Sequence, residues 1–255
     1  MSATETVVSR LRAAAKYRAV HPDTIAEVVA YEAGVLGPRA SASQLEQRVR
    51  GRLHKVAALH LLTAKPAALR RSADPREILA GHISTAERLP DLDAFYPLIL
   101  SLVPPPATIA DIACALNPFT LPWLRKVSPA SYTGYDLNAD FAALANDFLA
   151  AYPGCSVRHL DVLTSTPEPA DVALLLKTYH CIEDRQRGAA LSLVDRLPAR
   201  QVVVSFPTRA MNGRPAVFAR RHLAELAALA GSRGWASTRA TLPTEEFIVL
   251  DKEST

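Results

Sequence analysis

The sequence predicts an α/β fold, in which an open and largely parallel sheet follows a helical N-terminal domain. Two observations lead to this prediction. From residue 107 onward, short apolar runs alternate with helical patterns, and polar residues stand where each run stops. Before residue 80, apolar residues recur at helical spacing instead. We therefore expect a helical domain over residues 1–80 and a sheet domain over residues 81–255.

The apolar runs predict the strands of the sheet, at residues 107–113, 132–136, 156–160, 171–177, 201–206, 236–241 and 246–251. Helical patterns at residues 122–127, 139–151, 185–197 and 220–232 alternate with the earlier strands. Only the turn Leu242-Pro243-Thr244 separates the last two strands, which predicts a hairpin. A parallel sheet finished by such a hairpin is a Rossmann-like arrangement, and it is the usual body of class I, S-adenosylmethionine-dependent methyltransferases.

Three helical patterns make up the N-terminal domain. Residues 4–19 form the first, and Pro22 suits the first turn of the second, which Gly34 is expected to end. The third has the clearest start, because Ser43 with Glu46 three residues later forms a capping box before an apolar stripe. These patterns predict a small helical bundle.

Basic residues are concentrated in this N-terminal region. The chain has 29 Lys and Arg against 25 Asp and Glu, and residues 1–90 alone hold 14 against 8. Arg48, Arg52 and Lys55 share one flank of the third helix, and Arg70 and Arg71 lie in a turn-rich connection after it. The excess favours a polyanionic partner, nucleic acid ahead of a membrane, although a solvated surface is the alternative.

Several protein classes are excluded by simpler features. No apolar run is long enough to cross a bilayer, and the first residues lack a signal-peptide pattern, so we expect a cytoplasmic protein without a membrane partner. The cysteines, Cys114, Cys155 and Cys181, are odd in number and lack zinc spacing. Neither a disulfide framework nor a metal site is therefore expected.

Carboxylates close two consecutive strands. Asp136 ends the second strand, where a carboxylate can accept hydrogen bonds from both hydroxyls of a ribose. Asp161 ends the third, where it or the amide of Val162 can meet an adenine edge. Capping of the following loop is the alternative for each. Two such residues after consecutive strands favour a nucleoside-like ligand.

The ends of the other strands carry further polar groups. The first strand contains Asp111 and stops in small residues before Asn117-Pro118, so that a ligand can lie against its backbone, although no dinucleotide or phosphate-binding fingerprint is present. Lys177, Tyr179 and His180 follow the fourth strand, with a structural lysine and a packed tyrosine as the alternative. The fifth strand stops in Ser205-Phe206-Pro207-Thr208-Arg209, which offers the stacking and hydrogen bonds that a base swung out of an RNA helix needs.

Several of these segments together resemble one enzyme family. They are His82 to Pro90, Asp111-Ile-Ala-Cys-Ala-Leu-Asn-Pro118, Pro122-Trp123, Leu176-Lys177 with Glu183 and Gln186, and Ser205-Phe-Pro-Thr-Arg209 with Gly213-Arg214. In this order they are similar to the 16S rRNA (guanine(1405)-N7)-methyltransferases of aminoglycoside resistance, over roughly residues 80–220. Ala115 stands where that family usually has Gly.

The resemblance implies S-adenosylmethionine as the cofactor and the following roles. Arg88 would pair with the methionine carboxylate, Asp136 would hold the ribose, and Asp161 with Val162 would hold the adenine. The remaining cofactor residues would be His82, Ala113, Cys114, Ala115, Lys177 and Gln186. Phe206 and Tyr179 would stack on the target base, which Thr208 and Arg209 would orient. Phosphate contacts would come from Arg48, Arg52, Lys55, Arg70 and Arg71.

The implied reaction makes modest chemical demands. Guanine N7 has an in-plane lone pair, so we expect no obligatory general base and no metal, only in-line placement of the reacting atoms. The implied partner is 16S rRNA in the 30S subunit, met by a monomer whose helical domain docks on the ribosome. Two alternatives remain open: a methyltransferase of the same fold acting on another RNA site or a small molecule, and a non-catalytic RNA-binding relative.

Overall fold

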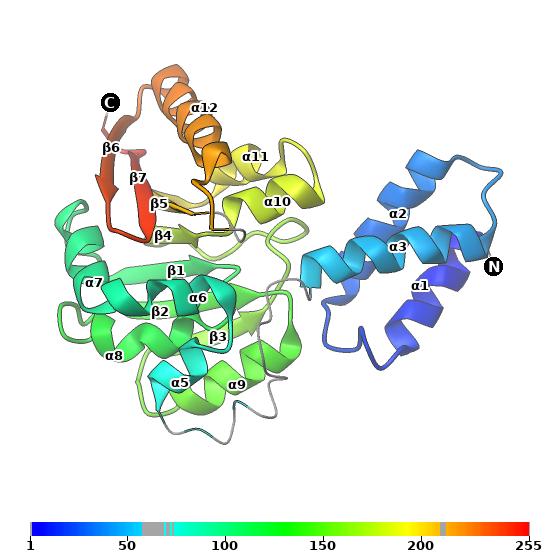
Figure 1. Cartoon of the computed structure of the whole chain (residues 1–255), viewed down its shortest axis with the longest axis horizontal. Helices are drawn as coiled ribbons and strands as arrows, with labels where there is room; N and C mark the ends of the chain where they lie inside the picture. The colour runs from blue at the N-terminus through cyan, green and yellow to red at the C-terminus, as the bar shows by residue number, and fades with distance from the viewer. Residues whose placement is uncertain (1, 58–68, 70–71, 73, 210–212, 255) are drawn as a thin grey trace.

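The computed structural model describes residues 2–57, 69, 72, 74–209 and 213–254. A helical domain lies beside a larger α/β domain (Figure 1). Arg70 and Arg71, two of the predicted phosphate contacts, are outside the described residues.

The helical domain is built from α1 (Ala3–Ala13), α2 (Pro22–Leu36) and α3 (Ala42–Ala57). Apolar side chains at helical spacing on all three meet in one core, among them Leu11, Val28 and Val49, each 0% exposed. The small bundle predicted from the sequence is therefore present.

Two helix boundaries differ from those expected. Helix α2 continues past Gly34 and ends at Gly37, whose φ of 78° suits glycine. Helix α3 is capped by Ser41 and Gln44, since the Ser41 hydroxyl accepts from the Gln44 amide at 3.2 Å and the Gln44 side chain accepts from the Ser41 amide at 3.0 Å. The expected box at Ser43 is wrong, because the same reciprocal chemistry occurs two residues earlier.

The α/β domain contains a seven-stranded sheet in the order β3-β2-β1-β4-β5-β7-β6. Its strands are β1 (Thr108–Ile112), β2 (Ser131–Asp136), β3 (Cys155–His159), β4 (Ala170–Leu176), β5 (Ala199–Pro207), β6 (Ala236–Thr241) and β7 (Glu245–Asp251). The first five pair in parallel, and β7 runs antiparallel to both β5 and β6. The predicted parallel sheet with a terminal hairpin is confirmed.

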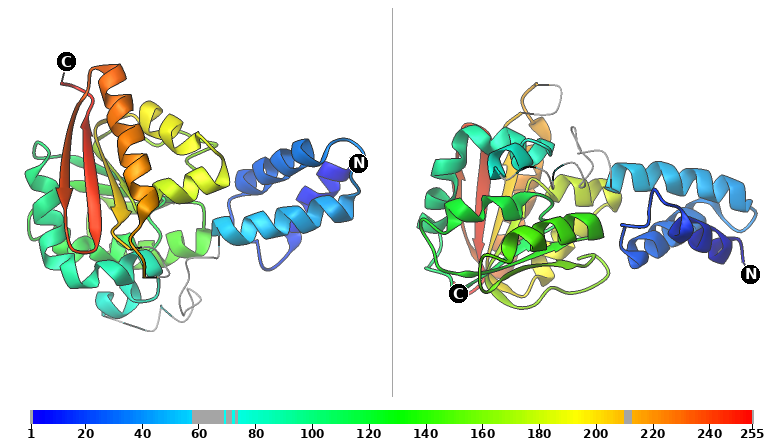
Figure 2. Two further views of the ribbon diagram at one scale, coloured as in Figure 1. Left: turned by 45° about the horizontal axis from the view of Figure 1, so that its top comes forward. Right: turned by 90° about the horizontal axis from the view of Figure 1, so that it is seen from below.

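Helices cover both faces of the sheet (Figure 2). One face carries α5 (Pro75–Leu79), α6 (Ile83–Arg88), α7 (Leu92–Ser101), α8 (Leu121–Leu124) and α9 (Ala139–Leu149), with the short 3-10 helices η1 (Leu89–Asp91) and η2 (Asn117–Thr120). The other carries α10 (Tyr179–Arg185), α11 (Ala189–Arg196) and α12 (Val217–Arg233). Because Ile78 and Leu79 join the core of the first face, α5 packs with the sheet domain.

A single helix over residues 185–197 is wrong. The chain forms α10 directly after β4, then turns at Gly188, whose φ is 81°, before α11 begins. Glu183 stabilises this break, since its carboxylate accepts from the amides of Gly188 at 2.8 Å and Ala190 at 2.9 Å. Tyr179 therefore starts a helix and does not extend from a strand end.

Candidate active site

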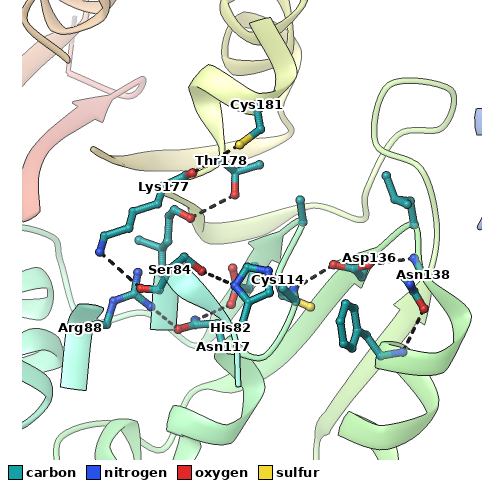
Figure 3. Close-up of a pocket in the computed structure, with 16 residues that line it drawn as sticks. His82, Ser84, Arg88, Cys114, Asn117, Asp136, Asn138, Lys177, Thr178 and Cys181 are labelled. Carbon is teal, nitrogen blue, oxygen red and sulfur yellow. Dashed lines mark hydrogen bonds between the residues drawn. The ribbon is translucent and has the colours of Figure 1, made fainter. Parts of the chain in front are cut away.

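A pocket opens at the carboxyl ends of β1, β2 and β4 (Figure 3). This is where ligands bind in open parallel sheets. Its lining comes from α6, the three strand ends and the turns that follow them: His82, Ser84, Arg88, Asp111, Ala113, Cys114, Ala115, Asn117, Asp136, Leu137, Asn138, Phe141, Leu176, Lys177, Thr178 and Cys181.

The backbone of the pocket adopts unusual conformations at two strand ends. Ala113, Ala115 and Lys177 have φ values of 53°, 44° and 54°, in the left-handed region that L residues avoid. Each such residue costs about 1–2 kcal/mol. Strain of this kind clusters at ligand sites, and the small side chains of the two alanines leave the backbone accessible from the pocket.

Asp136 is held at the end of β2 by two backbone amides. Its carboxylate accepts from Ala115 N at 2.8 Å and from Asn138 N at 2.8 Å. Burial raises the pKa of Asp136 to about 6, against the opposing effect of those amides. An ionised carboxylate has about four acceptor positions, so two remain for the hydroxyls of a ligand.

Two cations share the opposite side of the pocket (Figure 3). Arg88, 1% exposed, donates from Nε and Nη2 to the two carboxylate oxygens of Glu245 at 2.6 and 3.2 Å, and from Nη1 to Asn117 at 2.6 Å. Lys177 Nζ donates to Glu87 at 2.9 Å and lies 3.6 Å from Glu245. Burial acts to raise the pKa of Glu245, but Arg88 and Lys177 outweigh it and leave that pKa below its ordinary value. The pocket thus has a cationic end and a carboxylate end.

A network of hydrogen bonds extends from these cations into the sheet. Asp111 accepts from Asn117 Nδ2 at 2.6 Å and from the Tyr132 hydroxyl, and burial raises the pKa of Asp111 to about 6. Glu245 also accepts from the Ser205 hydroxyl at 2.7 Å. The chain of bonds ties the cationic end of the pocket to β1, β2, β5 and β7, which fixes it in one arrangement.

Comparison with known proteins identifies the family to which this fold and pocket belong. The family described as "Ribosomal RNA methyltransferase (FmrO)" matches residues 13–250. The chain belongs to this family of ribosomal RNA methyltransferases.

Individual proteins that are similar to this chain support the assignment. A protein of Micromonospora rosea named 16S rRNA (guanine(1405)-N(7))-methyltransferase is 30% identical over 257 residues, covering 93% of this chain and 92% of that protein. One of the same name from Serratia marcescens is 35% identical over 213 residues, covering 81% and 82%. The crystal structure of the 16S rRNA methyltransferase RmtF in complex with S-adenosyl-L-homocysteine has a TM-score of 0.82, 25% identity and 98% coverage of both chains. The expected class I methyltransferase sheet is confirmed by these likenesses.

Most of the cofactor residues expected from the family resemblance lie together. His82, Arg88, Ala113, Cys114, Ala115, Asp136 and Lys177 all line the pocket. Sequence reasoning missed Asn138 and Thr178, whose positions just after β2 and β4 were a usable signal. It also missed Glu245, which faces Arg88 only because β7 pairs with β5.

Three other predicted cofactor residues lie outside this pocket lining. Asp161 accepts from Arg185 of α10 at 3.0 and 2.6 Å and from the Thr24 hydroxyl of the helical domain at 2.5 Å. Val162 is buried in the core that α11 shares, and Gln186 is exposed just after α10. The roles of these three residues toward the cofactor stay predictions.

The two aromatic residues predicted to stack on the target base are both buried in this structure. Phe206 and Tyr179 are each 0% exposed, and their rings lie 5.5 Å apart between β5, α10 and α12. Stacking on a base is excluded in this conformation, since both ring faces are covered by protein. Thr208 donates to the Pro243 carbonyl at 2.8 Å, and only Arg209 among these four residues is exposed, with Nη1 3.2 Å from the Gly213 carbonyl.

Two of the predicted phosphate contacts form bonds within the protein, in the helical domain and across to α10. Arg48 and Arg52 both donate from Nε to Glu32, a carboxylate 2% exposed, and Arg52 Nη1 reaches the Arg185 carbonyl at 2.7 Å. Burial acts to raise the pKa of Glu32, but the two guanidinium groups lower it below its ordinary value. Lys55 is exposed as expected for a phosphate contact.

Proposed function

We propose that this chain transfers a methyl group from S-adenosylmethionine to N7 of guanine 1405 in 16S rRNA, acting as a monomer on the assembled 30S subunit. The observation that carries the proposal is a pocket with one carboxylate end and one cationic end, in a member of a ribosomal RNA methyltransferase family. The specific nucleotide is the one in the names of the similar proteins from Micromonospora rosea and Serratia marcescens.

The residues of the pocket fit this cofactor. Asp136 keeps acceptor positions for ribose hydroxyls, and Ala113 and Ala115 give access to the backbone. A guanidinium has five N–H donors, and Arg88 uses three on Glu245 and Asn117, which leaves two for a carboxylate. When bound, S-adenosylmethionine supplies an activated methyl group on a sulfonium.

The protein then has to orient the cofactor and the target base. Guanine N7 is nucleophilic through its in-plane lone pair, so no side chain has to remove a proton first. Asp136 and Arg88 sit at opposite ends of the pocket and hold two separate points of one ligand. Glu245 and Lys177 restrain Arg88, because the shared carboxylate binds both cations. Fixed placement of this kind can supply several kcal/mol of a methyl-transfer barrier.

The target side of the site is assigned to the end of β5. Arg209 is exposed there and follows Pro207, which pairs with Glu245 across the sheet. We assign Arg209 and Thr208 to the target nucleotide or its phosphate, and Lys55 with Arg70 and Arg71 to backbone phosphates of the rRNA. None of these roles requires a metal.

A methyl-transfer assay tests the function directly. Purified protein is incubated with methyl-labelled S-adenosylmethionine and, in parallel, intact 30S subunits, protein-free 16S rRNA and tRNA. We expect label on 30S subunits alone, at N7 of guanine 1405 when the modified base is mapped. Label at another base or on tRNA would identify a different target. No label on any of the three acceptors would favour a small-molecule substrate or a non-catalytic RNA-binding protein.

Resistance offers a second readout. Expression in a sensitive bacterium should raise tolerance to kanamycin and gentamicin but not to apramycin. The Asp136→Asn variant is the matched control, because it keeps the side-chain shape but removes the charge.

A further inference from the structure

A segment of the helical domain is hydrogen-bonded to the loop that carries Asp136. The His21 amide donates to the Leu137 carbonyl at 2.7 Å, and the Ala139 amide donates to the Ala19 carbonyl at 2.7 Å. Val20 and Asn138 thereby form an antiparallel β-bridge. Leu137 and Asn138 line the pocket, so a pocket-lining loop pairs directly with a segment of the helical domain.

The same loop controls the Asp136 carboxylate. Asn138 is bridged to Val20, and its amide donates to Asp136 at 2.8 Å. A shift of residues 19–21 would therefore move one of the two amides that orient the carboxylate expected to hold the ribose.

A second contact joins the helical domain to the next strand end. Thr24, 0% exposed, donates to Asp161 at 2.5 Å, and Arg185 bridges Asp161 to Glu27 with Nη2 2.6 Å from an oxygen of each. Burial acts to raise the pKa of Asp161, but Arg185 and Thr24 keep it below its ordinary value. This carboxylate is charged at neutral pH and its neighbours hold it in place.

The polar contacts between the two domains lie close together in the structure. The helical domain projects from one side of the sheet domain (Figure 2), and its polar bonds to that domain converge on the loops after β2 and β3 and on α10. Buried charged groups contribute little net stability compared with apolar packing, but they fix geometry. Of these two loops, the one after β2 carries Leu137 and Asn138, which line the pocket, and the one after β3 lies next to it in the strand order.

We infer that residues 19–27 are positioning residues for the cofactor. Thr24 and Glu27 anchor this segment on Asp161 and Arg185, and residues 19–21 then hold the β2 loop in the conformation that binds the nucleoside. This inference rests on the proposed function, since it takes the pocket to be the S-adenosylmethionine site. It adds that the helical domain helps to build that site, besides any contact that it makes with rRNA.

Calorimetry on the full chain tests the inference with S-adenosylhomocysteine as the probe. Thr24→Val keeps the side-chain shape but removes the hydrogen bond to Asp161, whereas Thr24→Ser keeps the hydroxyl. Thr6→Val is the matched control, because the Thr6 hydroxyl donates to the carbonyl of Ser2, the N-cap of α1, and not to the α/β domain as far as the described residues go. We expect Thr24→Val to weaken binding about 5-fold or more, with Thr24→Ser and Thr6→Val close to wild type.

Amide hydrogen exchange gives a test that needs no variant. The His21 amide bonds directly to the pocket loop, so S-adenosylhomocysteine should slow exchange at His21 and Ala139 in the wild-type protein. This measurement decides the matter if Thr24→Val does not fold.

The outcomes separate the inference from the proposed function. If wild type binds the probe, but Thr24→Val binds it equally well or exchange at His21 does not change, the positioning role is wrong and the proposed function stands. If the wild-type chain binds no S-adenosylhomocysteine, the proposed cofactor itself is wrong and the inference falls with it.

Discussion

The raised pKa of Asp136 makes cofactor affinity dependent on pH in a defined direction. Burial places this pKa at about 6, instead of the ordinary 3.8. The ionised carboxylate accepts from two backbone amides and keeps acceptor positions for ribose hydroxyls, whereas the protonated acid donates at one oxygen. The affinity for the cofactor should therefore be highest above the pKa of Asp136 and should fall as the pH is lowered below it.

The magnitude follows from the titration. At about pH 5, one unit below the pKa of Asp136, about 90% of the carboxyl is protonated in the free protein, so the apparent Kd should be about tenfold higher than at about pH 7. Calorimetric titration with S-adenosylhomocysteine across this range measures the change. The Asp136→Asn variant should bind weakly at every pH and lose the part of the pH dependence that comes from Asp136. The other titrating groups of the pocket are unchanged in this variant.

The expected loss of affinity is distinct from acid unfolding, because these buried carboxyls make the folded state more stable as the pH falls over this range. The folded pKa values of Asp136 and Asp111 are both about 6 and lie above 3.8, so the folded state holds more protons than the unfolded state between these values. Their contribution to the free energy of unfolding should thus rise as the pH falls from about 7 toward 5. A wild-type profile that is flat, or one that Asp136→Asn reproduces in full, would refute the reasoning.

Three further predictions concern the backbone, the core and the charged surface. Ala115→Gly removes a Cβ from a residue with a φ of 44° and should raise the free energy of unfolding by roughly 0.5–1 kcal/mol in urea titration; a decrease would show that this turn is unstrained. Phe206→Ala should lower the free energy of unfolding by about 3–5 kcal/mol in the same measurement, because the ring is fully buried. A variant of normal stability that no longer methylates would instead support the predicted contact between Phe206 and the target base. Lys55→Ala should weaken binding to 30S subunits and reduce its salt dependence, measured by filter binding at several salt concentrations. Arg48→Ala should mainly destabilise the helical domain through Glu32, and the opposite ranking of these two variants would contradict the assignment.

Local patterns were sufficient to predict the strands and the position of the pocket. An apolar run such as Val202 to Val204 becomes a buried strand wherever the sheet forms, and consecutive parallel strands bring their carboxyl ends to one edge. Asp136 was found for this reason, since its place at a strand end already defines its place in the fold.

Other predicted contacts have partners within the protein, which local patterns did not predict. Phe206 lies near the end of β5 on the face that α12 covers, and nothing near Phe206 in the sequence indicates this cover. Arg52 has the exposed spacing of a phosphate contact, but its partners are Glu32 on another helix and the Arg185 carbonyl in the other domain. Asp161 matches the position of an adenine contact, and Thr24 and Arg185 engage it instead.

The sequence alone therefore determined the order of the strands, the edge of the sheet at which ligands bind, and the family resemblance. Only the tertiary structure decided which polar groups remain available there, because Arg88 meets Glu245 and Thr24 meets Asp161 across more than a hundred residues of chain. The physical reason is that periodicity in a sequence reports burial along one helix or strand, whereas the availability of a charge depends on partners that folding brings from far away.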